Sequence, residues 1–297
     1  MSSRIIILVG ILVLVWVLVL VGLKVKLLKK ENFSQKRNLI EKEIKEEEIK
    51  MEKEFKEKET EKEKASEITL ISVYDNYQIN PELKTDWGFA LVIETPKEKI
   101  LFDTGGNSEI LLFNMKKLGI DPKSISKVII SHSHHDHLGG LEGFLKENSE
   151  VEVFILDSFP EKTKEMIKSY GAQLFEISKP QKISDFVFST GPLEGLPEEE
   201  SLIILSNQGL IVITGCAHPG IVNIVKKAKE MFPQKEVYLV LGGFHFPPKR
   251  VVEEFKNLGV KKVAPSHCSG EEIREAFKEE YQENFIENGV GKIIEIK

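Results

Sequence analysis

One short run of polar residues constrains this chain more than any other feature: residues 131–140 read SHSHHDHLGG. The potential ligands in the run are His132, His134, Asp136 and His137. Burying so many polar groups without partners is costly, and metal coordination would offset that cost. An apolar segment at 128–130 enters the run and a Gly139-Gly140 turn leaves it, so we predict a metal site rather than a histidine-rich surface tract.

The alternation of these residues indicates two ligand sets. On a loop that leaves a strand, His132 and His134 would project to one side and share one metal, whereas Asp136 and His137 would turn toward a second. Imidazole nitrogen and carboxylate oxygen suit several transition metals. We therefore expect one or two divalent metals, with zinc favoured and iron, manganese or magnesium as alternatives.

Strand and helix patterns alternate through the globular part of the chain, residues 67–297. Short apolar segments bounded by polar, Gly or Pro residues predict strands at 68–74, 89–94, 99–102, 128–130, 151–156, 173–177, 186–188, 201–205, 210–213, 236–241, 262–264 and 291–296. Helices are predicted at 107–118, 138–146, 161–170, 220–231, 249–258 and 271–279. This order suits two packed sheets with helices on their outer faces, an α/β/β/α sandwich.

The run resembles the signature H-x-H-x-D-H of the metallo-β-lactamase superfamily. The upstream segment LFDTG, residues 101–105, is similar to the strand-end element that buttresses the metal loop in that superfamily. The resemblance implies that Asp103 orients the loop without binding metal. A second interpretation, which does not exclude the first, is that Asp103 caps the helix that follows.

The resemblance also implies a third histidine at site one and a late histidine at site two. Three histidines remain beyond the run: His218, His245 and His267. Both His218 and His267 lie where a predicted strand gives way to a helix, so we assign His218 to site one and His267 to site two. The alternative for each is a satisfied core histidine.

The chain departs from the superfamily at one point, because many members bridge the two metals with a late aspartate. No aspartate follows Asp185, and Gly215-Cys216 stands at the comparable strand end. Three roles stay open for Cys216: a ligand, an outer partner of the ligands, or a small buried hydrophobic residue. His245 follows two glycines in LGGFH and is predicted to be a general acid or a donor to the substrate, with packing as the alternative.

Several longer motifs resemble one subgroup of the superfamily. The motifs are VYDN at 73–76, WGFA at 87–90, GCAHPGIVN at 215–223, LGGFH at 241–245 and SHCSG at 266–270. This subgroup contains the dihydropterin-ribofuranosylaminobenzene phosphate synthases and related bacterial metal-dependent hydrolases. Fold ancestry and substrate are separate matters, because one fold hosts many reactions.

Three functions follow as hypotheses. The first is a hydrolase that uses a metal-activated water on an ester, phosphoester or lactone, with Asp136 orienting the water or taking its proton. The second, implied by the subgroup, is a transferase that joins a dihydropterin methyl diphosphate to an aminobenzene ribosyl phosphate. The third is a non-catalytic metal-binding scaffold.

The N-terminal part differs in composition from the globular part. Residues 5–23 are nineteen consecutive uncharged, mostly apolar residues, long enough to span a bilayer, and four lysines follow them, which places the remainder in the cytoplasm by the positive-inside rule. We predict a transmembrane anchor at 1–30, a charged helical linker at 31–66 and a catalytic domain at 67–297. A cleaved signal peptide is the alternative to the anchor.

Charge and cysteine content narrow the partners of the globular part. Residues 67–297 carry 26 basic and 35 acidic side chains, a net charge of −9, which argues against nucleic acid as a substrate. Two cysteines cannot build a disulfide framework. We expect a small-molecule substrate, and the composition does not indicate an oligomeric state.

Overall fold

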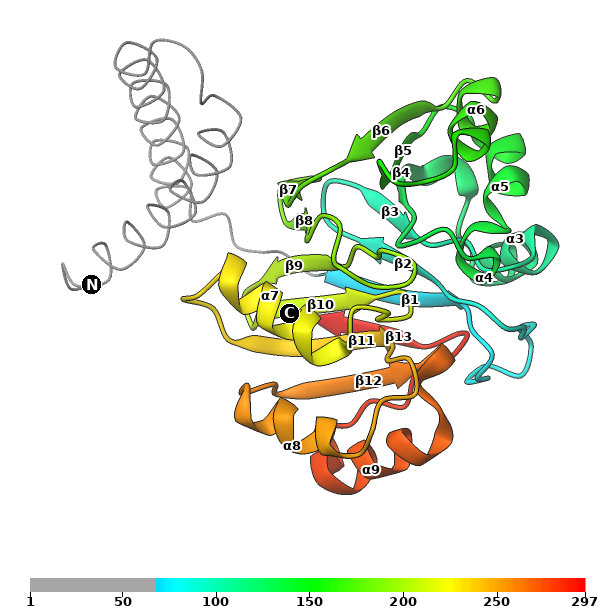
Figure 1. Ribbon diagram of the computed structural model, residues 1–297. Helices are drawn as coiled ribbons and strands as arrows, with labels where there is room; N and C mark the ends of the chain where they lie inside the picture. Colours follow the sequence, from blue (N-terminus) through cyan, green and yellow to red (C-terminus); the bar gives the residue numbers. More distant parts are fainter. Residues whose placement is uncertain (1–67, 297) are drawn as a thin grey trace, which may run out of the picture. The chain divides into compact units, whose positions relative to one another are not determined.

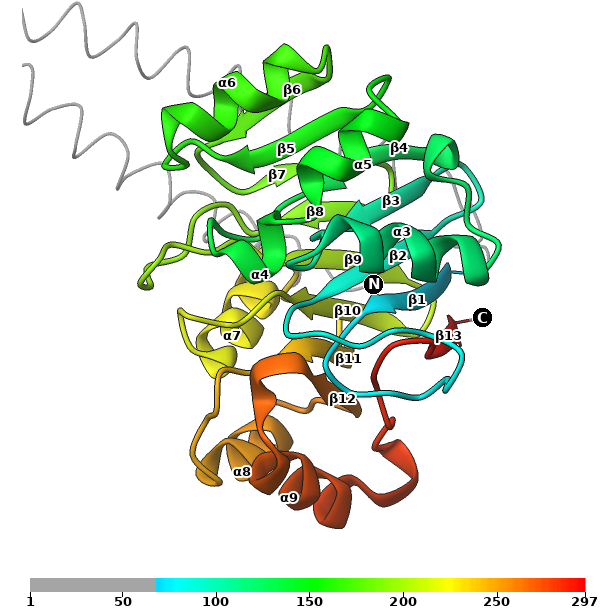
Figure 2. The ribbon, with the colours of Figure 1, turned by 90° about the vertical axis from the view of Figure 1, so that its right-hand side faces the viewer.

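The computed structural model describes residues 68–296, which form two mixed sheets packed face to face (Figures 1 and 2). In spatial order, the first sheet contains β13 (Ile293–Ile296), β1 (Ile68–Tyr74), β2 (Ala90–Glu94), β3 (Lys99–Phe102), β4 (Ile125–Ile129), β5 (Glu152–Leu156) and β6 (Gln173–Ile177). The second contains β12 (Lys262–Ser266), β11 (Val237–Gly243), β10 (Gly209–Thr214), β9 (Leu202–Ser206), β8 (Val187–Ser189) and β7 (Gln181–Lys182).

Strand alternation divides the apolar side chains between two layers of core. In β9 and β10, Ile204 and Ile211 belong to the core shared with the first sheet. Their neighbours Ile203, Leu210 and Val212 belong to a second cluster with the helices outside the second sheet. Both faces of these strands are therefore buried, which explains why their sequences are continuously apolar.

The helices cover the two outer faces of the sandwich. Against the first sheet lie α3 (Ser108–Lys117), α5 (Leu141–Glu147) and α6 (Glu161–Ser169), and the single turn α4 (His135–Leu138) lies in the connection between β4 and α5. Against the second lie α7 (Ile221–Met231), α8 (Arg250–Asn257) and α9 (Glu271–Tyr281). Short 3₁₀ turns at Pro122–Ser124, His267–Ser269 and Gln282–Asn284 complete the elements of residues 68–296. The predicted α/β/β/α sandwich is confirmed.

Strand direction gathers several loops at one edge of each sheet. Strand β1 runs antiparallel to β2, which runs antiparallel to β3, while β3 and β4 are parallel, so β1, β3 and β4 share a direction. In the second sheet β10, β11 and β12 are parallel. The carboxyl ends of each of these two sets of strands therefore meet at one edge of their own sheet, where the loops carry the polar residues identified above.

Two local expectations were wrong. The helix predicted over 138–146 is two helices, because α4 begins at His135 inside the histidine run and α5 begins at Leu141. The break falls at Gly139-Gly140, where a Cβ on Gly140 would lie 2.1 Å from the Thr104 carbonyl oxygen. Asp103 does not cap the next helix, since the Asn107 side chain accepts hydrogen bonds from the first backbone N–H groups of α3.

The predicted membrane span at 5–23 and the linker at 31–66 lie outside the described residues. Within residues 68–296, no helix combines the length and apolar character needed to cross a membrane. The anchor, the linker and the boundary at residue 67 stay predictions.

Candidate metal centre

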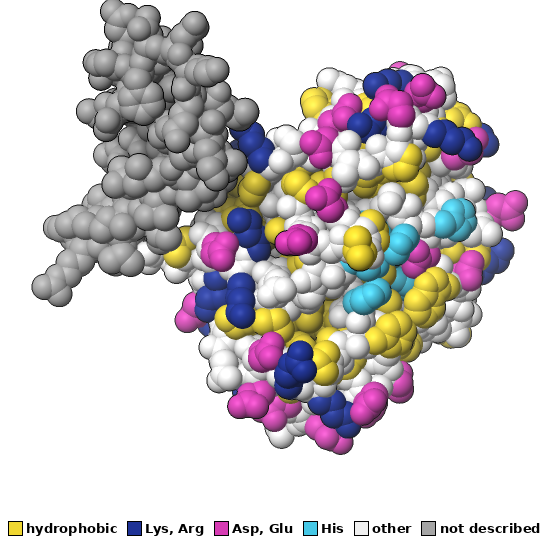
Figure 3. Space-filling view, viewed as in Figure 1, with side chains coloured by type: hydrophobic (Ala, Val, Ile, Leu, Met, Phe, Trp, Pro, Cys, Tyr) yellow, Lys and Arg dark blue, Asp and Glu magenta, His cyan; other side chains and the backbone are white. Residues whose placement is uncertain are grey.

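Seven histidine, cysteine and aspartate side chains from three segments of the chain meet at the carboxyl ends of the strands. They are His132 and His134 after β4, Asp136 and His137 on α4, Cys216 and His218 after β10, and His267 after β12. In the space-filling view, the histidine side chains that reach the surface gather in a patch on one face (Figure 3), while His132, His137 and His267 are buried. The structure thus brings together every residue that the sequence assigned to the metals.

His132, His134 and His218 form the first group of candidate ligands, here called site one. Their nearest ligand atoms lie within 4.8 Å of one another, and their ring centroids are 4.6 to 4.8 Å apart. The Nε2 atom of His132 is buried and has no hydrogen-bond partner. Because an unpartnered buried nitrogen is costly, this atom fits a metal ligand.

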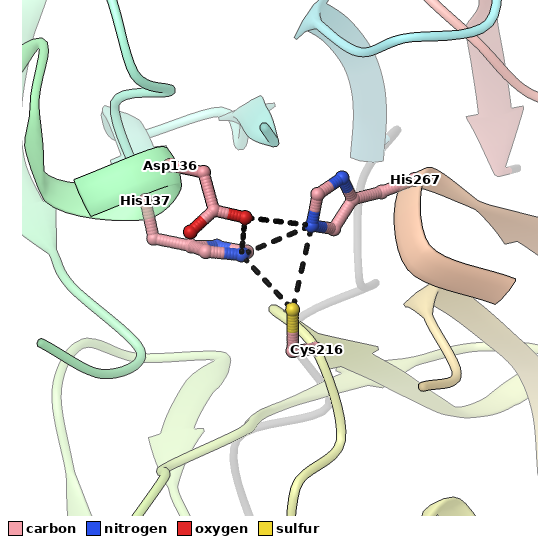
Figure 4. A group of neighbouring side chains, drawn as sticks. All are labelled: Asp136, His137, Cys216 and His267. Carbon is pink, nitrogen blue, oxygen red and sulfur yellow. Dashed lines mark hydrogen bonds and ion pairs between the residues drawn. The ribbon is translucent and has the colours of Figure 1, made fainter. Parts of the chain in front are cut away.

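Asp136, His137 and His267 form the second group together with Cys216 (Figure 4). The Nε2 atoms of His137 and His267 are 3.2 Å apart, and Asp136 Oδ2 lies 3.6 and 3.3 Å from them. The Cys216 sulfur lies 3.1 Å from His137 Nε2 and 3.4 Å from His267 Nε2. Imidazole nitrogen, carboxylate oxygen and cysteine sulfur are the donor types that proteins offer to zinc.

The position of Cys216 favours direct ligation among its three possible roles. Its sulfur belongs to the second group and also to a third group with His218 and His245, so the thiol lies between the two sites. Thiolate sulfur is a strong ligand for zinc. Where many superfamily members place a bridging aspartate, this chain presents a sulfur.

Asp103 connects both ligand groups to the end of β3. Its Oδ2 atom lies 2.7 Å from His137 Nδ1 and accepts from the Ser131 hydroxyl at 2.8 Å, while Oδ1 accepts from Ser131 N–H at 2.7 Å. The same hydroxyl lies 2.8 Å from His132 Nδ1. A metal at the Nε2 atoms of His132 and His137 would leave the proton on Nδ1 of each ring, and this network would then hold both rings in place.

The backbone at Asp103 is itself constrained. Its φ of 59° is in the left-handed region, which is uncommon for residues other than glycine. Burial raises the pKa of Asp103 well above its usual value, and the Ser131 hydrogen bonds lower it. A strained backbone persists only where surrounding contacts hold it, and here the hydrogen bonds of Asp103 with Ser131 and His137 do so.

Glu199 performs the matching task for His218, and the sequence did not reveal it. Its fully buried carboxylate lies 2.7 Å from His218 Nδ1 and accepts from the backbone N–H groups of Cys216, Ala217 and His218 at 2.8 to 2.9 Å. Burial opposes its ionisation, but the His218 hydrogen bond and the nearby His132 lower the pKa of Glu199 to about 2. In the sequence, Glu199 is the middle of three glutamates that read as a solvated surface.

Asp75 and Asn76, at the end of β1, hold His267. Asn76 Oδ1 lies 3.1 Å from His267 Nδ1, and Asp75 Oδ1 accepts from the His267 backbone N–H at 3.3 Å. His267 has a φ of 49°, so these contacts fix a strained turn. The sequence marked this segment only through its resemblance to a subgroup motif.

Burial favours the neutral form of two of the ligand imidazoles, those of His132 and His137. It lowers the pKa of His132 to about 2 and that of His137 to about 3, with neighbouring histidine charges acting in the same direction. Burial opposes ionisation of Asp136, but the hydrogen bond and charge of His267 and the charge of His137 lower its pKa below the usual value. Neutral imidazoles and an ionised carboxylate are the protonation states that bind metal.

His245 stands at the exposed side of site one. Its ring centroid is 4.5 Å from that of His218, and its φ of 57° is in the left-handed region. A hydrogen bond with Cys268 raises the pKa of His245. His135, the remaining histidine of the run, is exposed and belongs to none of the three groups.

The sequence of the chain is similar to those of proteins of known family. The model of the metallo-β-lactamase superfamily matches residues 88–226. The 7,8-dihydropterin-6-methyl-4-(β-D-ribofuranosyl)-aminobenzene-5′-phosphate synthase of Methanocaldococcus jannaschii is 33% identical over 280 residues, which cover 76% of this chain and 95% of the relative. An uncharacterized protein of the same archaeon is 31% identical over 247 residues, 70% of this chain and 93% of the relative.

Solved structures give the same result. The crystal structure of Tm1679, named a metal-dependent hydrolase of the β-lactamase superfamily, matches with a TM-score of 0.66 and 26% identity, covering 77% of this chain and 99% of that one. The chain belongs to the metallo-β-lactamase superfamily, whose fold binds divalent metals. Within it, the chain belongs to the subgroup that includes the dihydropterin-aminobenzene phosphate synthases and related metal-dependent hydrolases.

Proposed function

We propose that this protein is a zinc-dependent hydrolase that attacks an ester, phosphoester or lactone with a metal-activated water. The observation that supports this proposal is the pair of adjacent ligand groups with the Cys216 sulfur between them. Bound metals would supply acidity to a water molecule and positive charge to the oxygens of the scissile group.

Two side chains are placed to move protons. Asp136, with its lowered pKa, is ionised and partly exposed beside His267, so its carboxylate would orient the attacking water or accept its proton. His245 is exposed beside His218 and, with its raised pKa, would donate a proton to the leaving group. Asp103 and Glu199 act through the ligands, by fixing the rings that they contact.

The test uses the full chain loaded with zinc and a panel of bis(p-nitrophenyl) phosphate, a carboxylic ester and a lactone. We expect turnover of at least one class, and loss of turnover together with zinc in His134→Ala. The exposed neighbour provides the control, because His135→Ala should retain both. Retention of activity in His134→Ala, or less than one zinc per wild-type chain, would contradict the proposal.

A transferase reaction is the second candidate, favoured by the 33% identity to the archaeal synthase over almost the whole length of that relative. The reaction would join a dihydropterin methyl diphosphate to an aminobenzene ribosyl phosphate. Consumption of the pterin diphosphate only when the arylamine is present would support the transferase. Solvent-only turnover of a simple ester would support the hydrolase, and a zinc-loaded protein that turns over neither would be a metal-binding scaffold.

We also propose that residues 5–23 anchor the enzyme in a membrane with its catalytic domain in the cytoplasm. The support is the length of the apolar run and the lysines that follow it. Alkaline extraction should leave the full chain with membranes and release a chain lacking residues 1–30. Release of the full chain under the same conditions would contradict the anchor.

A further inference from the structure

Two aromatic side chains are exposed beside site two. Trp87 and Phe246 keep 49% and 63% of their surface accessible, and they are the only aromatic members of the large exposed hydrophobic side chains in residues 68–296. Their rings are nearly parallel, with an interplanar angle of 8° and centroids 6.5 Å apart. The Trp87 ring lies 4.8 Å from that of His267, and Figure 3 shows hydrophobic side chains directly beside the histidine patch.

The backbone next to Trp87 is hydrogen-bonded to the loop of residues 131–140, which carries the histidine run. Phe89 N–H donates to the Asp136 carbonyl oxygen at 3.2 Å. Gly88 adopts a φ of 142°, and a Cβ there would lie 2.4 Å from the same oxygen. The backbone on the carboxyl side of Trp87 therefore packs directly against the residue that carries one of the predicted ligands.

The backbone and ring of Phe246 contact the segment 267–270, which carries His267. The N–H of Phe246 donates to the Cys268 carbonyl oxygen at 2.9 Å, and its ring lies so close to Gly270 that a Cβ there would approach it to 2.7 Å. Both His245 and Phe246 adopt left-handed backbone conformations, with φ of 57° and 44°. Such strain persists only where the surroundings hold it, so the ring is exposed on a fixed support.

From this geometry we propose that Trp87 and Phe246 form an aromatic platform that binds a planar aromatic part of the substrate. A flat ring can lie against both parallel faces, whereas a puckered aliphatic ring of the same size cannot match them. A ring placed there lies next to His267, so a substituent one or two bonds away reaches site two. The platform rests on the proposed function, because it takes the metal centre as the place of reaction.

The test uses phenylphosphonate and cyclohexylphosphonate as probes with the full zinc-loaded chain. Their carbon–phosphorus bonds resist hydrolysis, and both carry the same metal-binding group. By calorimetry we expect phenylphosphonate to bind about fivefold more tightly, in line with typical stacking energies. In Trp87→Leu and Phe246→Leu the preference should fall toward equality, with cyclohexylphosphonate affinity little changed.

Three further variants keep the result interpretable. Ile293→Ala removes an exposed apolar side chain on β13 and should leave the preference intact. Trp87→Phe and Phe246→Tyr retain a ring and should retain the preference, which separates stacking from a general loss of structure.

The other possible results of these binding measurements also decide whether the aromatic platform exists. Equal affinity of the two phosphonates for the wild-type protein, or an unchanged preference in the leucine variants, would overturn the platform. Failure of both probes to bind would also overturn it, because a ring would then have no anchor at the metals. Absence of ester turnover together with an intact phenyl preference would remove the hydrolase and leave the platform standing.

Discussion

Replacing Asp103 with asparagine changes one atom and tests how the metal loop is held. The asparagine would keep the volume of the side chain and tolerates the left-handed backbone that Asp103 adopts. In the wild-type protein, Oδ2 of Asp103 accepts hydrogen bonds from two donors, Ser131 Oγ–H and His137 Nδ1–H. The other oxygen, Oδ1, accepts from Ser131 N–H. An amide has one accepting atom, so at least one of these buried donors loses its acceptor.

The size of the effect follows from those bonds. A buried donor without an acceptor costs about 1 to 3 kcal/mol, and a change of about 1.4 kcal/mol alters affinity tenfold. We therefore expect zinc affinity in Asp103→Asn to fall by about 10- to 100-fold, the usual range for partners that orient metal ligands. The loss should be larger at site two, because His137 contacts Asp103 directly whereas His132 contacts it through Ser131.

The assay is competition for zinc with a chromophoric chelator, with the fold checked by circular dichroism. Asp121→Asn is the matched control, because Asp121 is an exposed cap of a 3₁₀ turn and asparagine caps equally well. Wild-type zinc affinity at both sites in a folded Asp103→Asn protein would refute the orienting role.

Three further predictions concern Glu199, Cys216 and Glu200. Glu199→Gln should weaken zinc binding at site one by about 10- to 100-fold, measured in the same competition assay, whereas its exposed neighbour Glu198→Gln should not; equal behaviour of the two variants would contradict the role of Glu199. Cys216→Ser should lower the metal content and remove the sulfur-to-cobalt charge-transfer band of the cobalt-loaded protein, and Cys268→Ser should keep that band; a band that survives in Cys216→Ser would exclude ligation. Burial raises the pKa of Glu200 from 4.5 to about 8, so between these pH values the folded state holds a proton that the unfolded chain releases, and stability falls as pH rises. Glu200→Gln should flatten that fall in urea unfolding at pH 5 and pH 8, and an unchanged slope would show that Glu200 does not cause it.

The sequence determined the features that depend on local pattern. Apolar segments marked most strands, because burial of one face of a sheet makes apolar residues alternate and burial of both faces makes them continuous. The histidine run predicted a metal site, since its four candidate ligands lie within six residues. His218 and His267 could be added because few histidines remained and the resemblance to the superfamily required two more.

Only the tertiary structure decided the partners that lie far apart in the chain. Glu199 is buried against the loop of Cys216 to His218, although its glutamate neighbours suggest a surface. The Cys216 sulfur acquires its place between the sites from strand β10, and Trp87 meets Phe246 only because their loops pack on opposite ligand loops. A linear pattern records how each segment is buried, whereas these contacts depend on how parallel strands of two sheets bring their carboxyl ends to one edge.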